Sequence, residues 1–263
     1  MPYEHLSGLP EMGGEQILLL TRNDIRARYA GARLGALWSM ALPLLTLLVL
    51  WYVYERGFGN PPVENVPYIL WFTCAYLPWI FFSGSLETSG HSLLDYRFLI
   101  RKTAVPAHIF PLIRTISASL IHLLLLFTVI AVSGGLSPRF FVPLLYYYSS
   151  AVLLTFACGR ILAVLEACLE DLSSFLPVFL QFLFWTSPVL WDDSAMCDPG
   201  IRLILMLNPV RYLLKGYRCC LLSGRLPAPD RKETIIFWCW TAGLLLLGAR
   251  LMKRKEIFLA DEV

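Results

Sequence analysis

Long stretches of apolar residues, each almost free of charge, are the feature that most constrains how this chain can fold. A helix needs about 17–25 mostly apolar residues to cross a bilayer. The whole chain is 57% hydrophobic and only 16% charged, which does not suit a surface that faces water. We therefore expect a membrane protein. The predicted spans cover residues 37–54, 67–83, 110–132, 140–164, 175–191 and 235–251.

The same stretches distinguish between the two architectures that can cross a membrane. A transmembrane β-barrel has segments of about ten residues in which apolar and polar side chains alternate. The run of leucines at 123–126 does not alternate. The sequence therefore predicts an all-α membrane protein with six transmembrane helices in one domain, residues 37–251. An N-terminal segment, residues 1–36, precedes it, and a tail, residues 252–263, follows it.

Basic residues predict the orientation, because positively charged side chains collect on the cytoplasmic side of membrane proteins. Four arginines lie between residues 22 and 33, just before the first span, whereas the loop at 55–66 contains only Arg56. We therefore expect the N-terminus in the cytoplasm. With six spans the basic tail around Lys253 also lies inside. The net charge of +3 is too small to suggest a nucleic-acid partner.

Two amphipathic segments flank the first spans. As a helix, the segment before span one places Leu18, Ile25 and Tyr29 on one stripe, which predicts an interfacial helix in the plane of the lipid headgroups. The second segment, Leu86 to Tyr96, falls in the expected cytoplasmic loop after span two, where a short helix could transmit motion. A solvated turn is the alternative for this second segment.

Signatures spread along the chain resemble a known family. They are Arg22-Asn23-Asp24-Ile25-Arg26-Ala27-Arg28-Tyr29 with Arg33-Leu34-Gly35-Ala36-Leu37-Trp38 before span one, Leu77-Pro78-Trp79-Ile80-Phe81-Phe82 in span two, Leu99-Ile100-Arg101-Lys102, Pro106 and Ile109-Phe110-Pro111-Leu112 before span three, and Ser187-Pro188-Val189, Leu207-Asn208-Pro209 and Tyr217-Arg218 at and after span five. In this order they resemble the permease subunits of ABC-type polysaccharide exporters, the family that moves O-antigen and teichoic-acid polymers. Phe98, Ala107-His108 and Glu170 depart from the family pattern, all on the expected cytoplasmic side.

The resemblance implies a bacterial plasma-membrane exporter of lipid-linked polysaccharide, built from two copies of this permease and two ATPase subunits. It also implies that the loop at 86–96 is a coupling helix seated on the ATPase, helped by the interfacial helix and the loop with Asp171. The residues expected at this contact are Arg22, Asp24, Arg26, Arg28, Glu87, Asp95, Arg97, Arg101, Lys102 and Asp171.

The chain itself is not expected to be an enzyme or to hold a cofactor. It lacks the G-x-x-x-x-G-K-[ST] nucleotide loop and contains no Gly-Lys pair, so ATP and magnesium are expected in the partner subunit. Its cysteines do not have metal-ligand spacing, and Asp192-Asp193 is read as a solvated loop, so no metal site is expected.

The stretch 192–234 breaks the orientation rule, because it is basic and yet would lie outside. A seventh span would bury several charges at high cost, and Asn208-Pro209 must interrupt a helix. We therefore expect a re-entrant helical pair at about 195–223 that forms an outer gate. Its basic stripe should face water or the polymer path, and its apolar side should pack on the bundle. The gate residues are Pro188, Asn208, Pro209, Arg211, Lys215, Tyr217 and Arg218.

Aromatic side chains make up 14% of the chain, and their flat rings can stack on sugars or form interfacial belts. The candidates for a polysaccharide channel are Trp79, Phe82, Tyr146, Tyr147, Tyr148 and Trp185. His122 in span three is expected to be a hydrogen-bonded histidine between helices, and Arg114 is expected to reach the interface from a span end.

The sequence leaves two alternatives to polysaccharide export. An exporter of the same class could carry a drug or a non-polymeric lipid. An intramembrane enzyme would use Ser83, next to Gly84, with His108 or His122 as nucleophile and base, but the glycine expected two residues before the serine is Phe81.

Overall fold

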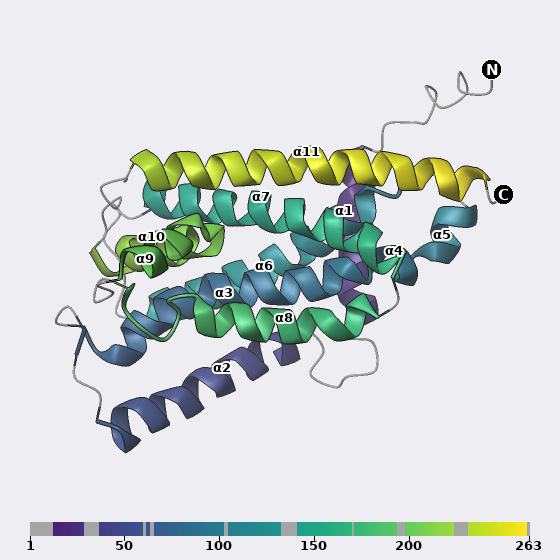
Figure 1. The fold of residues 1–263 in the computed structure, drawn as a ribbon. Helices are drawn as coiled ribbons and strands as arrows, with labels where there is room; N and C mark the ends of the chain where they lie inside the picture. The colour runs from purple at the N-terminus through teal and green to yellow at the C-terminus, as the bar shows by residue number, and fades with distance from the viewer. Residues whose placement is uncertain are drawn as a thin grey trace.

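The computed structural model describes residues 13–28, 37–59, 62–63, 66–102, 105–132, 141–169, 171–193, 198–223 and 231–261. These residues are helical almost throughout, which confirms the all-α prediction for this part of the chain (Figure 1). Extended pairing within them is limited to one bridge between Val63 and Val66. The elements are α1 (Gly14–Arg28), α2 (Leu37–Trp51), a π-helical turn η2 (Tyr52–Gly57), α3 (Tyr68–Gly90), α4 (Ser92–Asp95), α5 (Arg97–Lys102), α6 (Ile109–Val132), α7 (Phe141–Glu166), α8 (Leu172–Thr186), α9 (Pro199–Leu207), α10 (Pro209–Ser223) and α11 (Arg231–Asp261).

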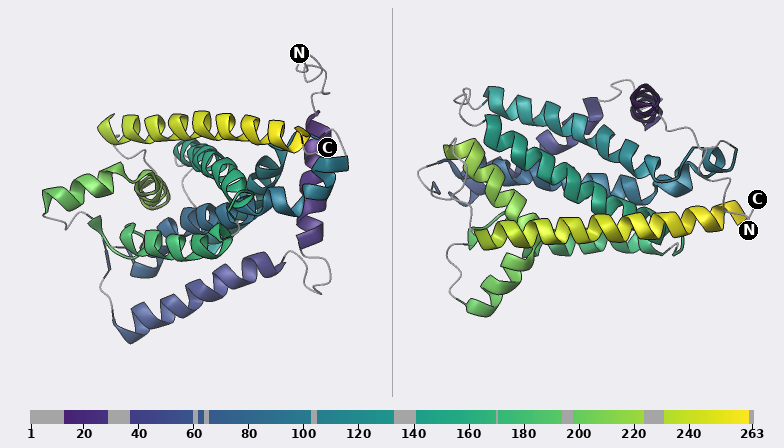
Figure 2. Two further views of the ribbon diagram at one scale, coloured as in Figure 1. Left: turned by 45° about the vertical axis from the view of Figure 1, so that its right-hand side comes forward. Right: turned by 90° about the horizontal axis from the view of Figure 1, so that it is seen from above.

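Long helices packed side by side form the body of the molecule. Helix α7 lies at the centre and packs against α3, α6, α10 and α11 (Figures 1 and 2). Four of the described helices are long and apolar enough to cross a membrane, over Tyr68–Gly90, Ile109–Ala131, Phe141–Glu166 and Arg231–Arg254. They coincide with predicted spans two, three, four and six. The chain is therefore a multi-pass membrane protein.

The other two predicted spans also correspond to helices, with one correction. The first, predicted over 37–54, is α2 followed by η2. The fifth, predicted over 175–191, is α8, which begins earlier and ends at Thr186. The predicted end was wrong because Ser187 precedes a proline, which disfavours helical geometry, and Ser187 is extended (φ −86°, ψ 146°). The count of six spans remains a prediction.

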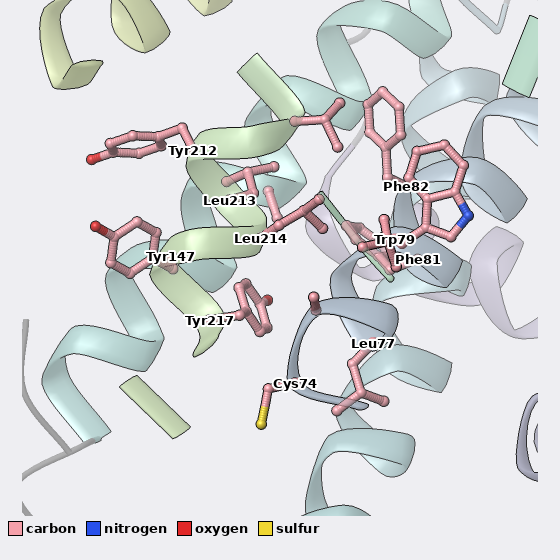
Figure 3. Close-up of a cluster of buried hydrophobic side chains, with 14 of the residues drawn as sticks. Cys74, Leu77, Trp79, Phe81, Phe82, Tyr147, Tyr212, Leu213, Leu214 and Tyr217 are labelled. Atoms are coloured by element: carbon pink, nitrogen blue, oxygen red, sulfur yellow. The ribbon is translucent and has the colours of Figure 1, made fainter. Parts of the chain in front are cut away.

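Apolar side chains bury themselves in two clusters along the bundle. The larger cluster joins α3, α7 and α10, with Phe72, Leu77 and Tyr217 among its most deeply buried members (Figure 3). The smaller cluster, which includes Phe110 and Met252, lies where α4, α6, α7 and α11 meet. Each end of the bundle therefore has its own packed interior.

Short helices cap the two ends of this bundle (Figure 1). Helices α1, α4 and α5 lie at one end, where α1 runs across the long helices almost at a right angle (Figure 2). Helices α9 and α10 lie at the opposite end, and the break between them falls at Asn208, as predicted from Asn208-Pro209. The side-chain oxygen of Asn208 accepts a 3.0 Å hydrogen bond from the Val210 N–H, which caps the start of α10.

Candidate functional site

A buried arginine joins three helices at the end of the bundle where α1 lies. Arg114, near the start of α6, forms ion pairs with Asp24 of α1 at 3.0 Å and with Asp95 of α4 at 2.5 Å. Asp24 is buried, so its charge depends on these partners. That Arg114 reaches the membrane interface stays a prediction, and within the protein two carboxylates hold its side chain. We call Asp24, Arg28, Asp95, Tyr96 and Arg114 the arginine hub.

Tyr96 and Arg28 complete the arginine hub. The Tyr96 hydroxyl donates a 2.8 Å hydrogen bond to Asp24, and the Arg114 guanidinium lies 5.3 Å from the centre of the Tyr96 ring. Arg28 pairs with the same aspartate at 2.8 Å across one helical turn. Burial, with this hydrogen bond and the charge of Asp24, raises the pKa of Tyr96 to about 12, so its hydroxyl keeps the donated proton at neutral pH.

The hub contains only some of the residues predicted to contact an ATPase. Asp24, Arg28 and Asp95 come together there. The residues with exposed side chains outside it are Arg22, Arg26, Glu87, Arg97 and Asp171. Arg101 and Lys102 belong to α5, but their side chains lie outside the described residues. A cleft of about 340 Å³ opens beside the hub between α1, the end of α3, α4 and the first turns of α8.

The predicted amphipathic segment from Leu86 to Tyr96 is helical in two pieces. Helix α3 continues to Gly90, and the single turn of α4 follows after His91. Leu86 and Leu93 are buried and Glu87 and Asp95 are exposed, as an amphipathic segment requires, but Leu94, predicted on the apolar side, is exposed. The segment is therefore a helix end with a break at His91, and not one continuous rigid helix.

Carboxylates pair with two basic residues of α10 at the opposite end. Arg211 forms ion pairs with Asp193, just before α9, and with Glu233 of α11, the latter at 2.7 Å. Lys215 lies 3.4 Å from the same glutamate and stays half exposed. The prediction that this basic stripe faces water or a polymer path was therefore wrong for Arg211. A charge beside apolar helices is stabilised by carboxylates that replace its water.

Arg218 is held by backbone carbonyls. It donates to Pro188 O at 2.7 Å, to Val189 O at 2.6 Å and to Trp71 O at 3.3 Å. Its guanidinium also lies 3.4 Å from the centre of the Trp71 ring. The stripe prediction was therefore wrong for Arg218 too, which ties α10 to α3 and to the turn that contains Pro188.

The apolar side of α10 packs on the bundle, as predicted. Leu213, Leu214 and Tyr217 are buried against α3 and α7 (Figure 3). The Tyr217 hydroxyl lies 3.0 Å from Nε2 of His122 in α6, which confirms the prediction of a hydrogen-bonded interhelical histidine. Asn208 donates a 2.9 Å hydrogen bond to Ser187, so the joint between α9 and α10 is fixed to the end of α8.

The aromatic candidates differ in their exposure. Trp79, Phe82 and Tyr147 are buried within the chain. Tyr146 and Tyr148 are half-buried. Tyr146 accepts a 2.9 Å hydrogen bond from Trp238, and Tyr148 stacks on His122. Trp185 is exposed. Their role in a channel stays a prediction, and the three buried rings have no open face within this chain to offer to a sugar.

The described geometry does not favour an intramembrane enzyme that uses Ser83 with His122. The Ser83 hydroxyl donates to the carbonyl of Trp79 at 3.0 Å, within its own helix. His122 is engaged by Tyr217. Ser83 and His122 therefore do not form a nucleophile and base pair.

The hub also contains a residue that the sequence reasoning did not assign to the site. Arg114 lies 90 positions from Asp24 in the chain, and no local spacing links the two. One signal was present: an arginine at the start of an apolar span needs a carboxylate or the membrane surface as a partner. Asp24 and Asp95 were two of several carboxylates on the same expected side, with Glu87 and Asp171 among the others.

Comparison with known proteins agrees with this arrangement. Residues 15–222 match the family described as ABC-2 type transporter, which takes in every helix from α2 to α9 and most of α1 and α10. An O-antigen export system permease protein RfbA from Myxococcus xanthus is 31% identical over 217 residues, covering 80% of this chain and 82% of that protein. A protein of the same name from Klebsiella pneumoniae is 26% identical, covering 80% and 81%. This chain belongs to the ABC-2 type transporter family.

Proposed function

We propose that this chain is the transmembrane subunit of an ATP-driven exporter that moves lipid-linked polysaccharide across the bacterial plasma membrane. The observation that carries the proposal is similarity to O-antigen export permeases over about four fifths of both chains. The many apolar helices support a membrane-embedded role. An O-antigen or a similar lipid-linked polymer is the substrate class that these relatives suggest.

The proposed topology has six crossings with both termini in the cytoplasm. Helix α2 with η2, and α8 with the turn after it, would add two crossings to the four long apolar helices. Helices α1, α4 and α5 would then lie on the cytoplasmic side, and α9 with α10 would form a re-entrant pair on the outer side. Their positions at opposite ends of the bundle support this assignment (Figure 1).

ATP hydrolysis would take place in a separate subunit, since the sequence has no nucleotide-binding loop. Two copies of the permease would work with two copies of that ATPase, which would bind the ATP and magnesium. The exposed face of α4 and α5 would receive the motion of the ATPase. The arginine hub would pass that motion to α1 and α6, because Arg114 is bonded to both neighbouring helices.

Purification of the tagged chain from membranes of its own cells tests the proposal of a partner. We expect an ABC ATPase to co-purify and the complex to hydrolyse ATP, whereas the isolated chain does not. Robust hydrolysis by the isolated chain, free of partner, would contradict the proposal.

Disruption of the gene tests the proposed substrate. Lipid-linked polymer should accumulate inside the cell and disappear from the surface, and a plasmid copy should reverse both changes. Normal surface polymer in the disrupted strain would refute polysaccharide export and would favour a drug or a non-polymeric lipid as the cargo.

A further inference from the structure

A buried carboxylate at the cytoplasmic end of α7 has no part in the arginine hub. Glu166 is the last residue of α7, and its side chain is fully buried. Its Oε2 atom lies 3.2 Å from Nδ1 of His91. Among the described residues, neither carboxyl oxygen has a hydrogen-bond partner. A buried carboxyl group without hydrogen bonds is costly, so its position needs an explanation.

The backbone of α3 touches the same carboxylate. A Cβ atom built on Gly90 would lie 2.0 Å from Oε1 and 2.6 Å from Cδ of Glu166. A larger residue at position 90 would therefore require the Glu166 carboxyl group to move. About two helical turns earlier in α7, a Cβ on Gly159 would lie 2.8 Å from Cβ of Ser89, so α3 and α7 approach closely here. The end of α3 is therefore packed directly on the end of α7.

His91 occupies the break between α3 and α4. Its Nδ1 atom lies 3.0 Å from the carbonyl oxygen of Glu87 as well as 3.2 Å from Glu166. A carbonyl oxygen can only accept, so Nδ1 carries a proton and donates it to Glu87, and its contact with Glu166 is not a hydrogen bond. The nearby cation Arg114 is already paired with Asp24 and Asp95. Among the described residues, His91 is therefore the basic side chain that lies against Glu166.

We propose that Glu166 is a positioning residue for coupling: it holds the break at His91 against α7, so that displacement of α4 and α5 moves α7. This inference rests on the proposed function, because it presumes an ATPase that pushes on α4 and α5. Helix α7 is suited to the role, since it packs against α3, α6, α10 and α11. Its other end reaches α10, where the Tyr147 ring lies within 2.1 Å of the place a Cβ of Gly216 would take.

The test compares export with ATP hydrolysis for Glu166→Gln in the complete complex. Gln keeps the size of the side chain and removes its charge. We expect surface polymer to fall at least tenfold in cells, while the purified complex in nanodiscs retains at least half of its ATP hydrolysis. Glu15→Gln is the matched control, because Glu15 is exposed in the first turn of α1, outside the predicted ATPase contact, and should change either readout less than twofold. Export by Glu166→Gln at the wild-type level would overturn the proposal.

His91→Gln gives an independent test on a half-exposed side chain, which keeps the proposal falsifiable if Glu166→Gln assembles poorly. It should show the same loss of export with retained hydrolysis, and the double variant should be no worse than either single one. Effects that multiply in the double variant would show that the two residues act separately and would overturn the proposal.

The variant pair Gly90→Ala and Gly90→Ala/Glu166→Ala separates charge from packing. If Glu166 acts through its charge, removing the side chain relieves the contact with the new methyl group without restoring export. Recovery of export in the double variant would reduce Glu166 to a packing role. Failure of the proposed function is seen separately, since the wild-type chain would then co-purify with no ATPase.

Discussion

The two ends of the bundle hold their arginines in different ways. In the arginine hub, Arg114 is bonded to side-chain carboxylates on α1 and α4. At the opposite end, Arg218 is bonded to main-chain carbonyls of Trp71, Pro188 and Val189. A carboxylate on a half-exposed helix can move with its side chain or exchange its partner for water. A carbonyl in a buried turn can do neither without moving the backbone.

This difference suggests how stability and motion are divided between the ends. Bonds to the backbone fix the relative positions of α3, α8 and α10, so we expect substitutions there to lower the stability of the whole fold. Bonds between side chains connect short helices that lie on the surface, so we expect substitutions there to loosen a local contact. Substitutions in the arginine hub should accordingly impair transport more than they impair folding.

The largest expected effect is that of Arg218→Ala. It leaves three carbonyls without their donor and removes the stacking on Trp71, so the free energy of unfolding should fall by on the order of 4 kcal/mol. Thermal unfolding in detergent measures the change. Arg218→Lys retains a charge but not the forked donor geometry, so its free energy of unfolding should lie between those of the wild type and Arg218→Ala. If Arg218→Ala unfolds at the wild-type temperature, the proposed difference in stability between the two ends of the bundle is wrong.

Arg114→Ala should affect the opposite end in a different way. Among the described residues, it leaves the buried Asp24 with Arg28 as its one cationic partner, and it should weaken the docking of α1 by about 3 kcal/mol. We expect export to fall at least tenfold, protease cleavage within α1 to become faster, and the global melting temperature to change less than with Arg218→Ala. Gln16→Ala, at an exposed position of α1 outside the predicted ATPase contact, is the control. Equal loss of melting temperature for Arg114→Ala and Arg218→Ala would contradict the division.

Gly216→Ala tests how rigid the α10 end is. Its new methyl group would lie 2.1 Å from the Tyr147 ring, so overpacking should cost about 1–3 kcal/mol. Gly243→Ala in α11 has no atom within 4 Å of its new methyl group and should leave stability unchanged or slightly higher. If both glycines tolerate alanine equally well in a thermal unfolding assay, α10 is looser than its buried contacts indicate.

The smallest effect is expected for Tyr96→Phe. It removes the hydrogen bond to Asp24, worth about 1 kcal/mol, and keeps the stacking on Phe110. Since the folded pKa of Tyr96, about 12, is above the ordinary value of 10, its contribution is present below pH 10 and is lost as the pH rises through 12. Protease access to α1 should therefore increase between pH 10 and 12 in the wild-type protein, more than in Tyr96→Phe. Identical pH profiles would show that this hydroxyl does not hold α1.

Local pattern was sufficient to predict much of this fold. Apolar runs located the long helices, and Asn208-Pro209 located the break between α9 and α10, because each signal acts within a few residues. The end of α8 was missed although Ser187-Pro188 carried the same kind of signal. There the apolar residues after the proline, which pack in the core outside a helix, extended the predicted span.

Partners across the fold were not predictable in this way. The family resemblance indicated Asp24 and Asp95, and helical spacing indicated Arg211 and Arg218. Neither signal identified the groups that bind these side chains. Those groups lie on other helices, and for Arg218 they are carbonyls, which every residue possesses. Glu166 carried a usable signal, as an acid at the end of an apolar run. Its pairing with His91 depends on how α3 and α7 meet, which periodicity does not specify.

Arg218 also has a meaning in terms of hydrophobic thickness. A helix of fifteen residues rises about 22 Å, whereas the hydrocarbon layer of a bilayer is about 30 Å thick. If α8 starts at one surface of the membrane, its helix ends while the chain is still at the depth of the lipid tails. At that depth no water is available to form a hydrogen bond with a free carbonyl group. The Arg218 guanidinium then takes the place of water as the hydrogen-bond donor to Pro188 O and Val189 O. It thereby permits a non-helical backbone at that depth.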